Sequence, residues 1–249
     1  MVTEVPTTTE IVCQNGGTPN GSRCHCPIQY GGRTCHRLIR DCSEPFYNHG
    51  YRTEVATLYN IQPQTAPCPF EVQCIFKWGG VVTVFRRGQG SNFDKNWEEY
   101  KEGFGDPDSG NFFVGLENLH HLLKQAKFEL NIWIENVDMK NGGAFYENVT
   151  VGSESESYAL SYDIFQDYRD FDADDGFSAS VPMSFSARDN DVNQCYNQSG
   201  NAGWYTPNCA GFGGVFSDGY FDWPFLGNAV EVSSMSFSFV RASPLYYDD

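Results

Sequence analysis

Phe128-Glu-Leu-Asn-Ile-Trp-Ile134 is the stretch of sequence that decides the fold. Apolar and polar residues alternate along it, which is the pattern of a strand with one face in a core and the other toward solvent. Segments of the same character lie on either side of it, at 81–85, 145–151, 158–165 and 233–240. Because Gly-rich turns separate several of these strands, including one at Asn141-Gly-Gly, we predict an antiparallel sheet.

Two short helices are predicted beside the sheet. Asp94 is suited to cap a helix over Lys95–Tyr100, with Trp97 turned inward. Leucines at 116, 119, 122 and 123 recur at helical spacing, so 116–124 is predicted to be an amphipathic helix. Strands with a few helices at one side make an α+β fold.

Residues 166–232 lose the periodic pattern and are rich in Gly, Asp, Asn and Pro. A stretch of this length without regular structure is uncommon inside a compact domain unless it is functional or disordered. Its aromatic residues, together with Cys195 and Cys209, favour an ordered, loop-rich subdomain.

Composition and charge exclude several classes of function. The chain has 249 residues, which suits one domain of ordinary size plus a small appendage. Its 32 acidic and 16 basic residues give a net charge of −16. This balance argues against nucleic acids and anionic membranes as partners. No apolar run approaches the ~20 residues that a membrane helix needs, so we predict no membrane insertion.

Cysteines and glycosylation sequons indicate a secreted protein. Nine cysteines without zinc-type spacing are typical of a disulfide framework in an oxidising compartment. Sequons begin at Asn20, Asn148 and Asn197, and all three are predicted glycosylation sites. The polar start MVTEVPTTTE is not a signal peptide, so we expect a segment of a longer secreted precursor.

The chain divides into four predicted regions. Residues 1–10 are a Thr- and Glu-rich flexible leader, and 242–249 form an acidic tail. Residues 11–36 hold four cysteines and almost no core-forming residues, so this small module must be held together by disulfides. Residues 41–241 form the large domain, which follows the module with little linker.

The small module resembles an epidermal-growth-factor-like (EGF-like) domain. The matching residues are Cys13-Gln-Asn-Gly-Gly-Thr18, Cys24-x-Cys26, Tyr30-Gly-Gly and Cys35. Two of the six cysteines of a complete domain are absent. The resemblance then implies disulfides Cys13–Cys24 and Cys26–Cys35, and a role either in receptor contact or as a spacer, which small modules of this kind commonly serve.

The large domain resembles the fibrinogen C-terminal domain of ficolins, tenascins and angiopoietins. The markers are Asp41-Cys42, Tyr59-x-Ile61-x-Pro63, Gly79-Gly80-x-x-Thr83-Val84-x-Arg86-Arg87, Trp97-x-x-Tyr100-Lys101-x-Gly103-Phe104-Gly105, Gly115-x-Glu117-Asn118-Leu119-His120, Phe185-Ser186, Asp189-Asn190-Asp191 and Trp204-Tyr205-x-x-Asn208-Cys209. The resemblance implies an α+β fold with a central antiparallel sheet, short helices and a loop-rich C-terminal subdomain.

The same resemblance implies the remaining disulfides. It pairs Cys42 with Cys74 and Cys195 with Cys209, which leaves Cys68 unpaired. An odd cysteine in a secreted chain forms an intermolecular bridge or stays a free thiol. A possible intermolecular disulfide through Cys68 is therefore predicted, with a buried, inert thiol as the alternative.

The resemblance also implies a calcium site. Its ligands are the carboxylates of Asp189 and Asp191 and the backbone at Asn193, and Ca²⁺ prefers six to eight such oxygens. The loop from Asp191 to Cys195 is shorter than in the family. A solvated acidic turn is the alternative. A second acidic cluster at 170–176 imitates an EF-hand but lacks its distal Glu, and a solvated loop is predicted there.

A ligand pocket beside the calcium loop is the last implication of the resemblance. Lectin-like members bind acetyl groups there, next to a cis peptide bond, which in this chain is Asn208–Cys209. Ala210 stands where those lectins carry His, and the following loop is shorter. The predicted ligand-binding residues are Trp204, Tyr205, Asn208, Cys209 and Phe212. The alternative is that the aromatic residues pack the core.

These features together predict a secreted recognition protein. The first hypothesis is binding of glycans or acetylated ligands in a pocket next to Ca²⁺. The alternative is a protein-binding ligand or matrix module without lectin activity. No nucleophile elbow, phosphate loop or dinucleotide fingerprint occurs, so we predict no catalytic residues and no enzymatic activity.

Overall fold

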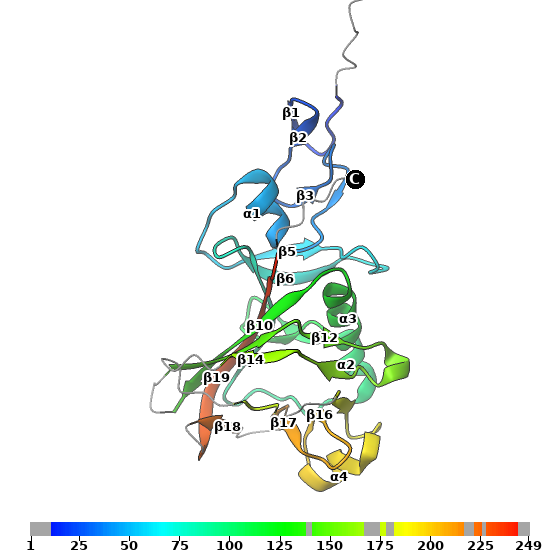
Figure 1. Cartoon of the computed structure of the whole chain (residues 1–249), viewed down its shortest axis with the longest axis vertical. Helices are drawn as coiled ribbons and strands as arrows, with labels where there is room; N and C mark the ends of the chain where they lie inside the picture. Colours follow the sequence, from blue (N-terminus) through cyan, green and yellow to red (C-terminus); the bar gives the residue numbers. More distant parts are fainter. Residues whose placement is uncertain are drawn as a thin grey trace, which may run out of the picture.

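The alternating segments fold into one large antiparallel sheet, as the computed structural model shows (Figure 1). The structure describes residues 11–137, 141–166, 175–177, 182–216, 222–225 and 228–243. For 211–216, 222–225 and 228–230 it describes the backbone alone. The sheet has ten strands, and its main path runs β14-β11-β10-β19-β7-β6-β5. The predicted α+β fold with a central antiparallel sheet is confirmed.

The strands of the main path are β5 (Thr57–Ile61), β6 (Phe70–Ile75), β7 (Val81–Gly88), β10 (Phe128–Asn136), β11 (Asn141–Glu147), β14 (Ile164–Gln166) and β19 (Asn228–Arg241). Three more strands join this sheet beside the path, namely β8 (Phe104–Asp106), β9 (Asn111–Phe113) and β18 (Asp222–Phe225).

Strand β19 lies in the middle of the sheet, between β10 and β7. Phe237 of β19 is paired with Ile132 on one side and with Phe85 on the other. All three side chains are buried. The segment 128–134 therefore packs one face into the core as its alternation predicts, and its neighbour comes from the far end of the chain.

Helices α2 (Trp97–Glu102) and α3 (Leu116–Lys124) lie next to each other on one side of the sheet (Figure 1). The four leucines that predicted α3 are all buried, and the prediction of its bounds is confirmed. The predicted cap of α2 is wrong. Asn96 caps this helix, because its side chain accepts from the Glu99 amide while the Glu99 carboxylate accepts from the Asn96 amide.

Two strand predictions also need correction. Gly142 and Gly143 do not form a turn but belong to β11, where they pair with Ile134 and Trp133. A side chain at Gly143 would meet the ring of Phe145. The predicted strand 145–151 breaks at Asn148, which has φ of 52°, and resumes as β12 (Thr150–Val151).

The segment 158–165 is likewise divided, into β13 (Leu160–Ser161) and the start of β14. A short 3₁₀ helix, η1 (Glu154–Glu156), precedes it. The loop-rich region contains more regular structure than predicted: β15 (Ser184–Ser186), η2 (Val192–Gln194), α4 (Cys195–Ser199), β16 (Ala202–Tyr205) and β17 (Gly211–Phe216).

The N-terminal module is built from two hairpins, formed by β1 (Thr18–Asn20) with β2 (Arg23–His25) and by β3 (Tyr30–Gly31) with β4 (Arg37–Leu38). Polar contacts join it to α1 (Ser43–His49) and to the residues that follow this helix. Arg37 makes two hydrogen bonds of 2.9 Å to the buried carboxylate of Glu44, and the Tyr51 hydroxyl donates to the Cys26 carbonyl at 3.2 Å.

Four disulfide bonds are present: Cys13–Cys24, Cys26–Cys35, Cys42–Cys74 and Cys195–Cys209. These are the pairs that the two resemblances imply. The leader 1–10 lies outside the described residues, as does most of the tail 242–249. The boundaries 11–36 and 41–241, and the EGF-like identity of the module, stay predictions. None of the described helices is long and apolar enough to cross a membrane.

Candidate functional site

Two loops meet at the end of the molecule farthest from the N-terminal module (Figure 1). One loop, 187–194, connects β15 to α4, and the other, 206–210, joins β16 to β17. The Cys195–Cys209 disulfide ties the two loops together. We call them the paired loops, and all three predicted metal ligands and most of the predicted pocket residues lie on or beside them.

Asp189 uses one carboxylate oxygen to anchor its loop to α2. Its Oδ1 accepts from the backbone amide of Trp97 at 2.7 Å. Trp97 is the first residue of α2, and its amide has no partner within the helix. A carboxylate at this position also interacts favourably with the helix dipole.

Asp191 accepts hydrogen bonds from amides at the start of α4, and it uses both of its carboxylate oxygens. Oδ1 accepts from the Tyr196 amide at 2.6 Å, and Oδ2 accepts from the Asn197 amide at 2.9 Å. Gln194, which precedes this helix, provides no side-chain cap and has a left-handed backbone. Asp191 therefore replaces the missing cap of α4.

The three predicted calcium ligands have protein partners in this arrangement. Asp189 and Asp191 face amide groups of two different helices, and the carbonyl of Asn193 lies 3.7 Å and 3.8 Å from the two sulfurs of the Cys195–Cys209 disulfide. Binding Ca²⁺ through Asp191 would compete with its two amide contacts. Across the described ranges, no three His, Cys, Asp or Glu side chains form a metal-binding group.

Two of the three aromatic residues predicted to line the pocket are core residues, which corrects that part of the prediction. Trp204 is 1% exposed, and its indole nitrogen donates to the Tyr158 carbonyl at 2.9 Å. Tyr205 is 3% exposed, and its hydroxyl lies 2.8 Å from both the Ser199 hydroxyl and the Asn201 carbonyl. Burial raises the pKa of Tyr205 to about 12.

Of the remaining pocket residues, Asn208 and Cys209 lie on the second loop and Phe212 lies in β17. Asn208 is exposed, and its side-chain oxygen accepts from the Thr206 hydroxyl. Cys209 has φ of 60°, and the expected cis bond before it is trans, since the described residues contain no cis peptide. Phe212 pairs with Trp204 in the hairpin, but its side chain lies outside the described part.

The three predicted glycosylation sites differ in accessibility. Asn20 and Asn197 are exposed, on β1 and α4 respectively. Asn148 is half-buried, and its side-chain nitrogen donates to the Asp163 carboxylate at 2.7 Å. A glycan would be attached through this nitrogen, so modification of Asn148 would have to release Asp163.

Two further predictions concern Cys68 and the acidic cluster. Cys68 is free and exposed, in the loop between β5 and β6. The alternative of a buried thiol is therefore wrong. Most of the cluster, 170–174, lies outside the described residues. Asp175 accepts from the hydroxyls of Tyr146 at 3.0 Å and Tyr162 at 2.8 Å. Burial, and then this carboxylate, raise the pKa of Tyr146.

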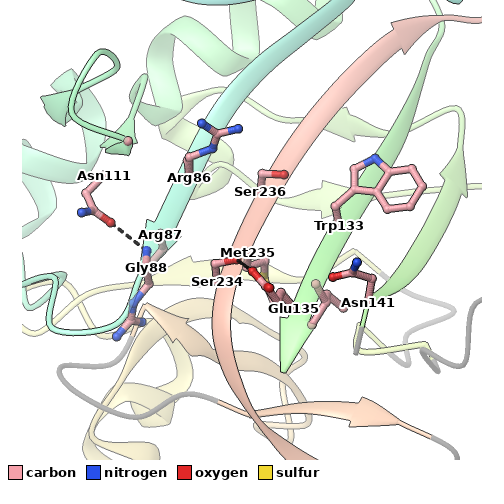
Figure 2. A pocket seen from close by; sticks show the side chains of 12 residues that line it. Arg86, Arg87, Gly88, Asn111, Trp133, Glu135, Asn141, Ser234, Met235 and Ser236 are labelled. Atoms are coloured by element: carbon pink, nitrogen blue, oxygen red, sulfur yellow. Dashed lines mark hydrogen bonds between the residues drawn. The ribbon is translucent and has the colours of Figure 1, made fainter. Parts of the chain in front are cut away.

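Sequence reasoning missed a cavity of about 630 Å³ on the solvent-facing side of the sheet. It lies over β7, β19 and β10 (Figure 2), and its lining residues include none from the paired loops. Trp133 of β10 lines it and is 43% exposed. The available signal was the position of Trp133 in the alternation of 128–134, which places it opposite to the core-facing isoleucines.

Comparison with known proteins gives one consistent result. Residues 38–222 match the family described as fibrinogen beta and gamma chains, C-terminal globular domain. Fibrinogen-like protein 1 from Homo sapiens is 32% identical over 202 residues, which covers 74% of this chain and 63% of the relative. The chain thus spans less than two thirds of the length of that relative.

Two solved structures share the fold. The fibrinogen-like globe domain of human ANGPTL2 superposes with a TM-score of 0.71 at 24% identity, covering 82% of this chain and all of that domain. Lamprey fibrin D-dimer, solved with the peptide Gly-His-Arg-Pro-amide, gives a TM-score of 0.63 at 24% identity, covering 83% and 75%.

Proposed function

Because the chain belongs to the family of the C-terminal globular domain of fibrinogen beta and gamma chains, we propose that it is a secreted recognition protein that binds a peptide segment of an extracellular partner. The family is non-enzymatic and its members are secreted. The four disulfides and three sequons fit that compartment.

The observation that carries the proposal is the rigid, exposed construction of the paired loops. Their carboxylates and their disulfide fix the backbone, whereas Asn193, Pro207 and Asn208 remain exposed. Loops held by a rigid scaffold are a common place for recognition. The buried rings of Trp204 and Tyr205 leave a polar surface, which suits a peptide better than an acetyl group in an aromatic pocket.

Charge favours a cationic peptide. The chain carries a net charge of −16, and a field of this sign attracts basic ligands and repels acidic ones. The lamprey structure supplies a suitable probe, since Gly-His-Arg-Pro-amide contains an arginine and a free amino terminus.

Calorimetric titration of the full chain with Gly-His-Arg-Pro-amide tests the proposal. We expect saturable binding that weakens with salt and falls by roughly tenfold in Asn193→Ala, Asn208→Ala, because both residues belong to the paired loops. The control is Asn60→Ala, which alters an exposed residue of β5. Absence of binding, or equal affinity in both variants, would overturn the proposal.

A calcium-dependent lectin is the second candidate. The observation in its favour is that Asp189 and Asp191 lie two residues apart on a loop tied down by a disulfide. Calcium binding by Asp189, Asp191 and Asn193 stays a prediction. A melting temperature that rises with Ca²⁺, together with binding of N-acetylglucosamine that EDTA abolishes, would support the lectin. No shift in the melting temperature would exclude the metal site.

A covalent partner at Cys68 also belongs to this proposal. Its thiol is exposed, and an exposed thiol is open to disulfide exchange in an oxidising compartment. Non-reducing electrophoresis of protein secreted from cells should show a disulfide-linked species that Cys68→Ser removes. A monomer band alone in the unmodified protein would contradict this.

A further inference from the structure

Strand β5 leaves one end of the large sheet open. It is the last strand of the main path, and among the described residues it pairs only with β6. In an antiparallel pair, about half of the backbone N–H and C=O groups of a strand point away from its neighbour. The outward groups of β5 therefore form a row of donors and acceptors to which a further strand can bind.

The accessible part of this edge is the segment 55–60. Val55, Thr57 and Asn60 are all exposed. Just past the end of the strand, the Gln62 amide donates to the Ile39 carbonyl at 2.9 Å. The link to the N-terminal module thus covers the edge beyond β5, whereas the exposed residues of 55–60 lie before that point.

Strand β5 lacks the features that usually keep an edge strand from pairing. Proteins protect such edges with charged side chains, proline or a β-bulge. No charged residue occurs between Glu54 and Glu71, although 19% of the chain is charged. The sequence of β5, TLYNI, contains no proline, and its register with β6 is continuous. Its β-branched and aromatic residues favour a strand.

Exposed apolar side chains extend the surface at the start of this edge. Val55 lies directly before β5 and Trp78 shortly after β6, and they are 68% and 67% exposed. Their chain neighbours Glu54 and Lys77 form an ion pair with each other. This pair holds the two segments together and leaves their charges balanced. Apolar and aromatic groups gathered at the surface are typical of protein interfaces.

We propose that two copies of the chain pair through β5 and form a dimer. A twofold axis perpendicular to the sheet makes two identical edge strands antiparallel, so each copy offers the same surface to the other. An uncharged edge gives no attraction to an acidic or a basic partner. It does allow two chains of net charge −16 to meet without placing like charges in contact.

This dimer is closed and needs no disulfide. Pairing occupies the β5 edge of both copies, so association through it stops at two chains. The loop that carries Cys68 follows β5. Because the two strands run in opposite directions, the two Cys68 loops lie at opposite ends of the pair. The opposite end of the main path is less suited to pairing, since β14 has three residues and short edge strands resist it.

Net charge predicts how the dimer responds to salt. Two molecules of the same charge repel each other, and salt screens this repulsion. Higher salt should therefore strengthen the dimer, whereas it should weaken the peptide binding proposed for the paired loops. The two proposals respond to salt in opposite directions, so the failure of one is distinguishable from the failure of the other.

Sedimentation equilibrium of the full chain carrying Cys68→Ser, which removes any bridge through that thiol, tests the proposal. We expect the average mass to rise from that of a monomer toward that of a dimer between low and high micromolar concentration, because a small interface gives modest affinity. Thr57→Glu combined with Asn60→Glu should weaken the dimer by roughly tenfold, since it places like charges across the strand pair.

The matched control is Lys124→Gln combined with Lys127→Gln. It makes the net charge more negative by the same amount, at exposed positions outside β5, and should weaken the dimer far less. Amide hydrogen exchange locates the contact, because the amides of 55–61 should exchange more slowly at high protein concentration. Unaltered melting temperatures at low concentration show that the variants fold.

Four results would overturn the β5 dimer. They are a monomer at every concentration, equal weakening in the two charge variants, assembly that continues past two chains, and exchange in 55–61 that does not depend on concentration.

Discussion

At the scale of single residues, the most consequential contact is a buried ion pair that closes the domain. Asp41 and Arg241 are both inaccessible to solvent, with 3.4 Å between Arg241 Nη2 and Asp41 Oδ2. Asp41 also accepts from the Ser43 amide at 2.8 Å and from the Gln125 side chain at 3.2 Å. Asp41 is therefore a meeting point for three distant segments of the chain.

We expect Asp41→Ala to lower the free energy of unfolding by about 3–5 kcal/mol, because it leaves Arg241 charged and buried without this carboxylate. The measurement is urea denaturation at neutral pH. As a control, Glu54→Ala removes the exposed partner of Lys77 and should cost under ~1 kcal/mol. If both variants lost the same free energy of unfolding, the burial of the Asp41–Arg241 pair would not contribute to stability.

At the scale of secondary-structure elements, the sequence predicted the helix with a regular apolar face but not the residues that cap the helices. Four buried leucines at regular spacing predicted α3 to its last residue. Helix α2 begins after Asn96, because a capping box with Glu99 outcompetes Asp94. The role of Asp191 was not visible, since it caps a helix across a turn in which Gln194 is left-handed.

Replacement of Asp191 by Ala should cost about 1–2 kcal/mol, because two amides at the start of α4 lose their acceptor. The loss should be the same in EDTA and in millimolar Ca²⁺, measured by thermal denaturation. The control is Asp108→Ala, at an exposed position between β8 and β9. A loss that appears only with Ca²⁺ would show that Asp191 is a metal ligand instead.

At the scale of the whole molecule, the N-terminal module and the large domain share an interface rich in histidine and tyrosine. His25 of the module meets His49 of α1 at 5.6 Å between ring centroids, and Tyr51 lies 6.1 Å from His25. The alternation of apolar and polar residues predicted the central antiparallel sheet. This interface was not predictable, because it joins residues with no periodic pattern in common.

Acid should weaken the protein through this interface. Burial, followed by repulsion from His25 and Arg23, lowers the pKa of His49 from 6.5 to about 4. Between these values the unfolded chain binds more protons than the folded one, so the free energy of unfolding falls as pH falls. We expect His49→Gln to flatten the dependence of the melting temperature on pH across this window.

The control for this experiment is His36→Gln, since His36 is exposed and its ring nitrogen bonds to Thr34 on the surface of the module. The slope of melting temperature against pH should stay unchanged in that variant. An equal flattening in both, or none in His49→Gln, would remove His49 as the source of acid sensitivity.

The central position of β19 has a consequence for how the protein is made. Without residues 228–241, the main path of the sheet separates into β14-β11-β10 and β7-β6-β5, because β19 is the strand between them. A nascent chain on the ribosome therefore holds two unjoined half-sheets until its final strand has been synthesised. The open strand edges can pair with other chains during this interval, so a premature stop would yield an aggregation-prone fragment rather than a smaller domain.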